Sequence, residues 1–173
     1  MKQPQLGLTL IELMVSLVIL VIGLIGIFNL HIVAKHGSFE SFQQTQAAYL
    51  AHDIVNRMKL NRSELSNYAD TYTGVREKVN SCETKICSTT QMLHWDQYQW
   101  DQTLLGALEQ AEGRNIGGLD SPIACVTEGA GEVSVTITWR GVRALGSPAT
   151  TPSDCGHSLG KKRRVFTLKT MIL

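Results

Sequence analysis

The sequence has little that marks an enzyme. It contains no His-Glu-x-x-His pair, no phosphate-binding loop, no dinucleotide-binding glycine pattern and no Cys-x-x-Cys pair. Its five histidines follow no metal-ligand spacing, and we expect His31, His36 and His52 to have surface or packing roles on a helix. These absences favour a protein without catalytic activity and without a cofactor.

Charge is absent from one long segment. No Asp, Glu, Lys or Arg occurs between Leu13 and Ala34, and 14 of the 18 residues from Leu13 to Leu30 are apolar. An apolar run of this length can cross a membrane as a helix. The chain from Lys35 onward is polar and moderately charged, long enough for one small core but too short for a large pocketed enzyme. We therefore expect a single domain with a membrane anchor.

The net charge of the chain is only +1. Because nucleic-acid affinity comes largely from clustered basic residues, we do not expect DNA or RNA binding. The charges are unevenly placed: 11 acids and 4 bases lie from Glu64 to Glu132, whereas 7 bases and one acid, Asp154, lie from Arg140 onward. We interpret this asymmetry as complementarity within the molecule, with a charged partner surface as the alternative. The run Lys161-Lys162-Arg163-Arg164 is interpreted as a solvated turn or a charge-protected edge strand.

All four cysteines lie beyond the apolar run, hence on one side of any membrane that it enters, and an even number there suggests disulfides. Three connectivities are possible. We favour Cys82 with Cys87 and Cys125 with Cys155 because neither loop crosses the other, and the longer loop would then stabilise the fold by about 3 to 4 kcal/mol. Zinc is the alternative, since the gap between Cys82 and Cys87 and the closeness of Cys155 to His157 loosely resemble ligand spacings.

The amino terminus is unlike a conventional secretory signal, in which small residues follow an apolar core and direct its removal. Here the small residue, Gly7, precedes the apolar segment, which is too long and has no good downstream cleavage site. The apolar segment should therefore stay in the mature protein. Glu12 lies at its start, and a carboxylate at membrane depth costs a few kcal/mol unless it is paired or near the interface.

A cut after Gly7 would supply a partner for Glu12. The new amine of Leu8 would carry the opposite charge about one helical turn away, but within one helix the two groups meet only awkwardly. A neighbouring copy or related subunit, shifted along the helix axis, can present its amine to Glu12 instead. The carboxylate then sets the register of lateral assembly. The alternative is an interfacial Glu12 whose side chain reaches water.

One segment resembles the class III signal of type IV prepilins: Gly7-Leu8-Thr9-Leu10-Ile11-Glu12-Leu13. The resemblance implies that a membrane peptidase, the prepilin peptidase, cuts after Gly7 and methylates the new amine of Leu8. Leu8 stands where the family most often has phenylalanine, which is a conservative replacement.

Further features are similar to the PilV group of minor pilins. They are Ile22-Gly23-Leu24-Ile25-Gly26, Gln46-Ala47-Ala48-Tyr49-Leu50-Ala51-His52-Asp53-Ile54-Val55-Asn56-Arg57-Met58 with Asn61-Arg62, and the later order of Cys82, Cys87, Asp96, Trp100, Cys125 and Trp139. The resemblance implies a low-abundance subunit that primes assembly of a type IV pilus and lies near its tip. Its partners would be other minor pilins, the major pilin and a large tip adhesin, and it would support adhesion and twitching motility.

The resemblance also implies an organisation. Residues 1–7 would be a leader peptide, residues 8–34 the transmembrane and assembly half of a helix, and residues 35–173 a periplasmic head. The protein would lie in the bacterial inner membrane before assembly and at the pilus tip afterwards. Two alternatives stay open: a minor pseudopilin of a type II secretion system, and a membrane-tethered periplasmic enzyme or ligand-binding module.

The predicted fold is α+β, a long N-terminal helix packed on a small antiparallel sheet. Helical spacing of apolar residues without proline predicts one helix over residues 8–60. Residues 61–90 indicate loop and short helix, and residues 91–111 a helix with Asp96 and Asp101 on its surface. Alternating patterns predict strands over residues 123–127, 132–139 and 164–172, with the odd-numbered side chains of the second strand facing the helix.

Overall fold

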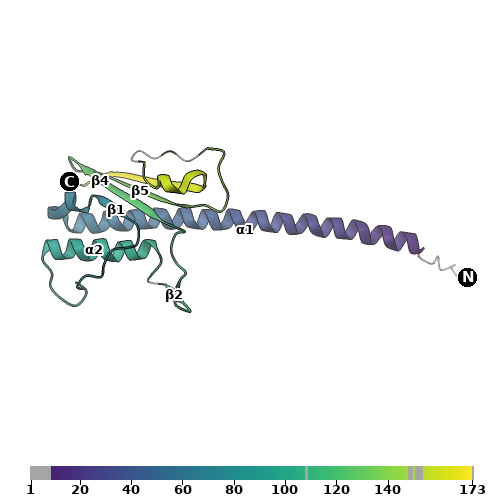
Figure 1. Ribbon diagram of the computed structural model, residues 1–173, viewed down its shortest axis with the longest axis horizontal. Coiled ribbons are helices and arrows are strands. Elements are labelled where there is room, and N and C mark those ends of the chain that lie inside the picture. Colours follow the sequence, from purple (N-terminus) through teal and green to yellow (C-terminus); the bar gives the residue numbers. More distant parts are fainter. Residues whose placement is uncertain (1–8, 108, 148–149, 151–153, 173) are drawn as a thin grey trace, which may run out of the picture. The chain divides into compact units, whose positions relative to one another are not determined.

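The computed structural model describes residues 9–107, 109–147, 150 and 154–172 (Figure 1). It contains a long helix, α1 (Leu10–Leu60), followed by a short 3-10 helix, η1 (Arg62–Tyr68). The chain divides into two compact units, one ending at Phe39 and the other beginning at Glu40. The described residues of the first unit are Thr9 and the first part of α1, whereas the second unit, the head, contains the rest of α1 and the core.

The head contains a four-stranded antiparallel sheet in the order β1-β4-β5-β6. Its strands are β1 (Asp70–Tyr72), β4 (Ile123–Gly129), β5 (Glu132–Arg140) and β6 (Arg163–Met171). Three of them lie where the alternating sequence pattern predicted strands. The predicted α+β fold, a long helix on a small antiparallel sheet with two disulfides, is confirmed.

The core lies between α1 and the sheet. Within the head, α1 buries one stripe of residues at helical spacing: Ala47, Leu50, Ala51, Ile54, Val55 and Met58. From β5, the odd-numbered residues Val133, Val135, Ile137 and Trp139 enter the same cluster, as predicted. Every second side chain of β5 faces the helix, and these side chains thus pack on the stripe of α1, whose residues recur about every 3.6 positions.

A second helix, α2 (Thr89–Leu104), covers the other side of this part of α1 (Figure 1). It starts at a capping box in which Ser88 accepts from the backbone N–H of Gln91 and the Gln91 side chain accepts from the N–H of Ser88. Trp100 of α2 is fully buried, and its indole Nε1 donates to the carbonyl of Leu50 at 2.9 Å. This bond fixes α2 against α1 inside the core.

The structure differs from the sequence-based prediction after Leu104. The helix ends there, seven residues before the predicted end at Ala111. Gly106 has a positive φ of 68°, and its backbone approaches Gly118 so closely that a Cβ on either residue would collide with the other. The chain then forms a small hairpin, β2 (Gln110–Ala111) and β3 (Arg114–Asn115), which was not predicted.

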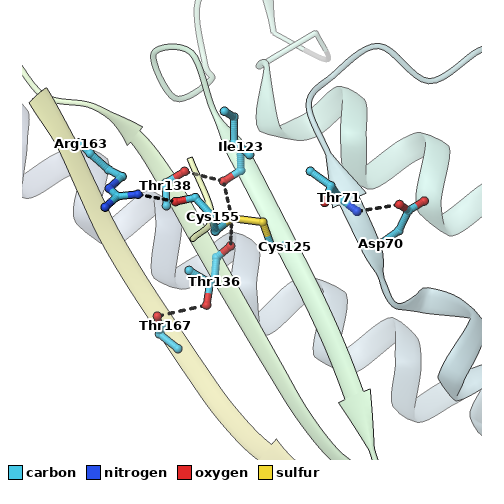
Figure 2. Close-up of a disulfide and its surroundings, with 9 residues drawn as sticks. All are labelled: Asp70, Thr71, Ile123, Cys125, Thr136, Thr138, Cys155, Arg163 and Thr167. Atoms are coloured by element: carbon cyan, nitrogen blue, oxygen red, sulfur yellow. Dashed lines mark hydrogen bonds between the residues drawn. A yellow bond between two sulfur atoms is a disulfide. The ribbon is translucent and has the colours of Figure 1, made fainter. Parts of the chain in front are cut away.

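The cysteines form two disulfides, Cys82–Cys87 and Cys125–Cys155, which is the connectivity favoured from the sequence. Figure 2 shows the second one, which joins β4 to the turn before the 3-10 helix η2 (His157–Lys162). All four sulfurs are consumed in these bonds, so none remains as a zinc ligand.

Candidate functional site

The described residues of the first unit present an exposed apolar surface. Every described residue from Thr9 to Lys35 is exposed, including large apolar side chains on all sides of the helix. Among the described residues, α1 is the one helix long and apolar enough to cross a membrane by length and composition. A helix that is apolar all round requires lipid or other helices as its surroundings.

Glu12 lies in the first turn of α1 and is exposed. The carbonyl of Thr9 accepts from the backbone N–H groups of Glu12 at 3.1 Å and of Leu13 at 3.2 Å, so the helical hydrogen bonding begins at Thr9. No ion pair of the described residues involves the Glu12 carboxylate. Gly7 and Leu8, the predicted cleavage and methylation residues, lie outside the described residues. Within the described part of the chain, Glu12 thus has the favourable end of the helix dipole and no paired cation.

The histidines predicted to have surface or packing roles all lie on α1. His31 and His52 are exposed, and His36 is partly buried. The described part of the chain contains no group of three or more His, Cys, Asp or Glu side chains that could hold a metal ion.

The prediction that Asp96 lies on the surface of α2 was wrong. Its residue is only 7% exposed, and its carboxylate accepts from the Tyr68 hydroxyl at 2.7 Å and from Arg57 Nη1 at 3.1 Å. Arg57 also donates to Asp53 at 3.0 Å and to the Gln99 side chain at 2.7 Å. Burial, reinforced by the hydrogen bond to Asp96, raises the pKa of Tyr68. The network ties α1, η1 and α2 together.

Asp101 is fully buried and was also wrongly placed on the helix surface. Its two carboxylate oxygens accept from the backbone N–H groups of Gly74 at 2.7 Å and Arg76 at 2.9 Å. The guanidinium of Arg76 lies 4.7 Å from the ring centroid of Tyr72, whose ring meets Trp100 edge-on at 4.8 Å. Asp101 therefore anchors the loop that follows β1.

The basic run is only partly solvated. Lys161 and Lys162 are exposed at the end of η2, whereas Arg163 and Arg164 begin the edge strand β6. Arg163 is 5% exposed and donates to the carbonyl of Cys155 at 3.0 Å, and Arg164 pairs with Glu40 of α1 at 2.9 Å. These two arginines hold the head together, so the interpretation as a solvated turn applies to the lysines alone.

The acidic and basic segments, which we expected to attract each other, form few ion pairs in the described part of the chain. Among the described residues, one ion pair joins the two segments: Lys169 and Glu132, 4.0 Å apart and each 60% exposed. An exposed pair of this kind contributes at most about 1 kcal/mol.

The segment from Gly156 to Gly160 contains a catalytic pattern that was not recognised in the sequence. Gly156-His157-Ser158-Leu159-Gly160 matches the Gly-x-Ser-x-Gly nucleophile pattern of hydrolases. In hydrolases that serine lies on a sharp turn between a strand and a helix, next to a general base. Here Ser158 is exposed within η2 and precedes a strand, and the hydrogen bonds found among the described residues give it no His or Asp partner. The pattern occurs without the geometry of a catalytic triad.

Comparison with protein families gives two matches. The prokaryotic N-terminal methylation motif matches residues 2–28, and the family described as Tt1218-like, type IV pilin Tt1218, matches residues 29–98. Together the two matches cover more than half of the chain. Over residues 2–98 the chain is therefore similar to type IV pilins that carry the methylation motif. No curated protein and no solved structure matches it.

The similarity to type IV pilins accounts for the exposed apolar surface of the first unit. Pilins are structural proteins that assemble with other pilins after processing by a prepilin peptidase. The prepilin signal and the exposed apolar half of α1 fit membrane anchoring before assembly.

Proposed function

We propose that this protein is a minor pilin of a type IV pilus, related to the PilV group, which primes assembly and lies in the tip complex. It is cleaved after Gly7 and methylated at Leu8. The observation that carries the proposal is the exposed carboxylate of Glu12 at the start of an apolar helix surface whose described residues are all exposed from Thr9 to Lys35.

The step from Glu12 to assembly is electrostatic. A carboxylate in the apolar part of a membrane or of a helical bundle costs a few kcal/mol if it stays unpaired. The amine of Leu8, exposed by cleavage and kept basic after methylation, is a cation of the required charge. In a neighbouring subunit shifted along the axis, it can reach Glu12 and set the register.

The proposed organisation follows from the distribution of exposed apolar residues. Residues 1–7 are a leader, residues 8–34 span the inner membrane and later enter the filament, and residues 35–173 form the periplasmic head. Two disulfides in the head support this placement, because disulfides persist in oxidising compartments such as the periplasm.

The resemblance to the PilV group supports a minor rather than a major subunit. The segment that carries the resemblance, from Gln46 to Met58, includes the buried stripe of α1 and Arg57, which binds Asp96. It therefore sets the architecture of the head that would meet other minor pilins, the major pilin and a large tip adhesin. Through that complex the protein would support adhesion and twitching motility.

Mass spectrometry of pili sheared from cells tests the processing step. We expect a peptide that begins at methylated Leu8. An intact Met1 terminus on assembled protein would contradict the proposal. The proteins that co-purify with the tagged chain separate the alternatives: pilins and an adhesin support it, whereas partners from a type II secretion filament favour the pseudopilin.

Substitution of Glu12 tests the register. Glu12→Ala should leave membrane insertion unchanged and reduce the number of pili, because the cation of the neighbour then has no partner. Asn29→Ala is the matched control, since it also removes a polar side chain from the apolar segment and should leave piliation unchanged. Normal piliation with Glu12→Ala would count against the role of Glu12.

A further inference from the structure

The outer face of α2 carries an aromatic pair that the core does not use. Trp95 and Tyr98 are both partly buried, with ring centroids 5.8 Å apart and ring planes inclined by 37°. The other two tryptophans, Trp100 and Trp139, are at most 2% exposed. Trp95 is thus the tryptophan that reaches a surface hollow.

This hollow, the α2 hollow, has a volume of about 350 Å³, at the lower end of the range for small-molecule sites. Four of its lining residues belong to α2 and have the spacing that places residues on one helix face: Trp95, Tyr98, Gln99 and Gln102. The other lining residues come from the loop before α2, from Ala107 after it and from strand β2.

Hydrogen bonds within the lining and to residues outside it hold the side chains of the hollow in place. Gln99 donates to Glu83 at 3.4 Å and accepts from Arg57. Gln102 donates to the carbonyl of Gly74 at 3.3 Å. The Cys82–Cys87 disulfide closes the loop that carries Glu83. A site whose side chains are already oriented loses less entropy when it binds a ligand.

The charges of the hollow exclude a polyanion. It is lined by one cation, Lys78, and one carboxylate, that of Glu83. Single-stranded nucleic acids also stack on aromatic rings, but they require a positively charged groove along the backbone. The α2 hollow has aromatic rings but lacks a positively charged groove among its lining residues.

Besides the charged groups of Lys78 and Glu83, the lining of the hollow contains three side-chain amides. Gln110 of β2 joins Gln99 and Gln102 in its lining and donates to Asn115 at 3.1 Å. Gln102 and Gln110 donate through the amide nitrogen, so within the described part of the chain each amide oxygen is available as an acceptor. An amide side chain both donates and accepts hydrogen bonds, as a sugar hydroxyl does.

We propose that the α2 hollow binds an uncharged oligosaccharide. A sugar ring has one face of C–H groups, which stacks on Trp95 and Tyr98, and a rim of hydroxyl groups, which hydrogen-bond to the glutamine amides. A peptide segment is the competing occupant, because aromatic residues also recur at protein interfaces. The combination of a small concave site, neutral charge and three amides favours the sugar.

Saturation-transfer NMR on the full chain in a zwitterionic detergent tests this proposal, since a detergent with a sugar headgroup would compete. The probes are maltotetraose, cellotetraose, chitotetraose and β-1,4-galactotetraose, with octathymidylate and a pool of unstructured octapeptides beside them. We expect transfer to at least one sugar. Absence of transfer to all four sugars, or transfer to the nucleotide or peptides alone, would overturn the proposal.

Variants locate the site. Trp95→Ala should weaken sugar binding at least tenfold, and Gln102→Ala provides a milder change if the first variant does not fold. Tyr49→Ala is the matched control, because Tyr49 is an aromatic residue on α1 that is 69% exposed and outside the hollow. Undiminished binding in folded Trp95→Ala or Gln102→Ala would refute the site. Glu12→Ala should bind sugar normally, so a failure of the assembly proposal would be recognised separately.

Discussion

The hydroxyl of Tyr68 donates a 2.7 Å hydrogen bond to the carboxylate of Asp96, which lies 28 residues later in the chain. The same carboxylate pairs with Arg57, so one buried acid connects α1, η1 and α2. Asn61 extends the connection, since its side chain donates to the carbonyl of Thr89 at 2.8 Å and to the Tyr68 hydroxyl at 3.3 Å. The end of α1, the short helix and the start of α2 are therefore held by polar contacts as well as by the core.

Removal of this carboxylate should destabilise the head. Asp96→Ala leaves the buried Tyr68 hydroxyl without its acceptor, and we expect the free energy of unfolding to fall by about 1–3 kcal/mol. Asp53→Ala is the matched control: it removes the other carboxylate bound to Arg57, which is more exposed, and should cost about 0.3–0.5 kcal/mol. Urea unfolding of the full chain in detergent, followed by tryptophan fluorescence, measures both. Equal losses in the two variants would contradict the importance of the buried contact.

The two disulfides should contribute unequally. Cys125 and Cys155 are 30 residues apart, so replacing both by serine should lower the free energy of unfolding by about 3–4 kcal/mol. Cys82 and Cys87 are 5 residues apart, and the same loop-entropy argument gives about 2 kcal/mol for their replacement. Urea midpoints of the two double variants provide the comparison. A larger loss from the short loop would show that loop entropy does not dominate.

Alkaline pH should weaken the head through Tyr72. Burial raises the pKa of its hydroxyl from 10.0 to about 12, because the charged phenolate is poorly solvated in the core. The folded state therefore favours the protonated form. The resulting stability is fully present below the unfolded pKa of 10 and is lost as the pH rises through 12.

Melting temperatures between pH 9 and pH 12 check this expectation. Tyr72→Phe should show a shallower decline than the wild type, because one of the groups that resist ionisation is gone. At neutral pH the variant should be less stable by about 0.5–1.5 kcal/mol, since the hydrogen bond to the Tyr68 carbonyl is lost. Tyr49→Phe, at an exposed position, should follow the wild-type profile. A decline as steep in Tyr72→Phe as in the wild type would refute the assignment.

Local sequence patterns predicted the helix and the strands that can be identified without knowing which distant residues they contact. The spacing of Leu50, Ile54 and Met58 predicted the helix, and the alternation from Val133 to Trp139 predicted the central strand and its inward face. Each pattern repeats along a continuous segment, so the period identifies the element. The three-residue strand β1 and the hairpin β2–β3 were missed because such short elements form only where a partner strand or a close backbone approach holds them.

The buried acids illustrate the limit for the site. Asp96 and Asp101 flank Trp100, and their charge alone favoured the helix surface. Their burial depends on Tyr68 and Arg57 for the first and on the loop at Gly74 for the second, all distant in sequence. A polar residue next to a buried helix stripe can be either exposed or buried. It is buried where the fold supplies partners for its hydrogen bonds.

The sequence by itself determined the processing signal, the apolar helix surface and the position of Glu12, because each is a property of consecutive residues. The disulfide pairing agreed with a simple preference for loops that do not cross, although the sequence left three connectivities open. Only the tertiary structure decided that Asp96, Asp101 and Arg163 are buried and that Trp95 and Tyr98 line a hollow with three glutamines. Those facts depend on which distant segments come into contact, and the periodic pattern of neighbouring residues carries no information about such contacts.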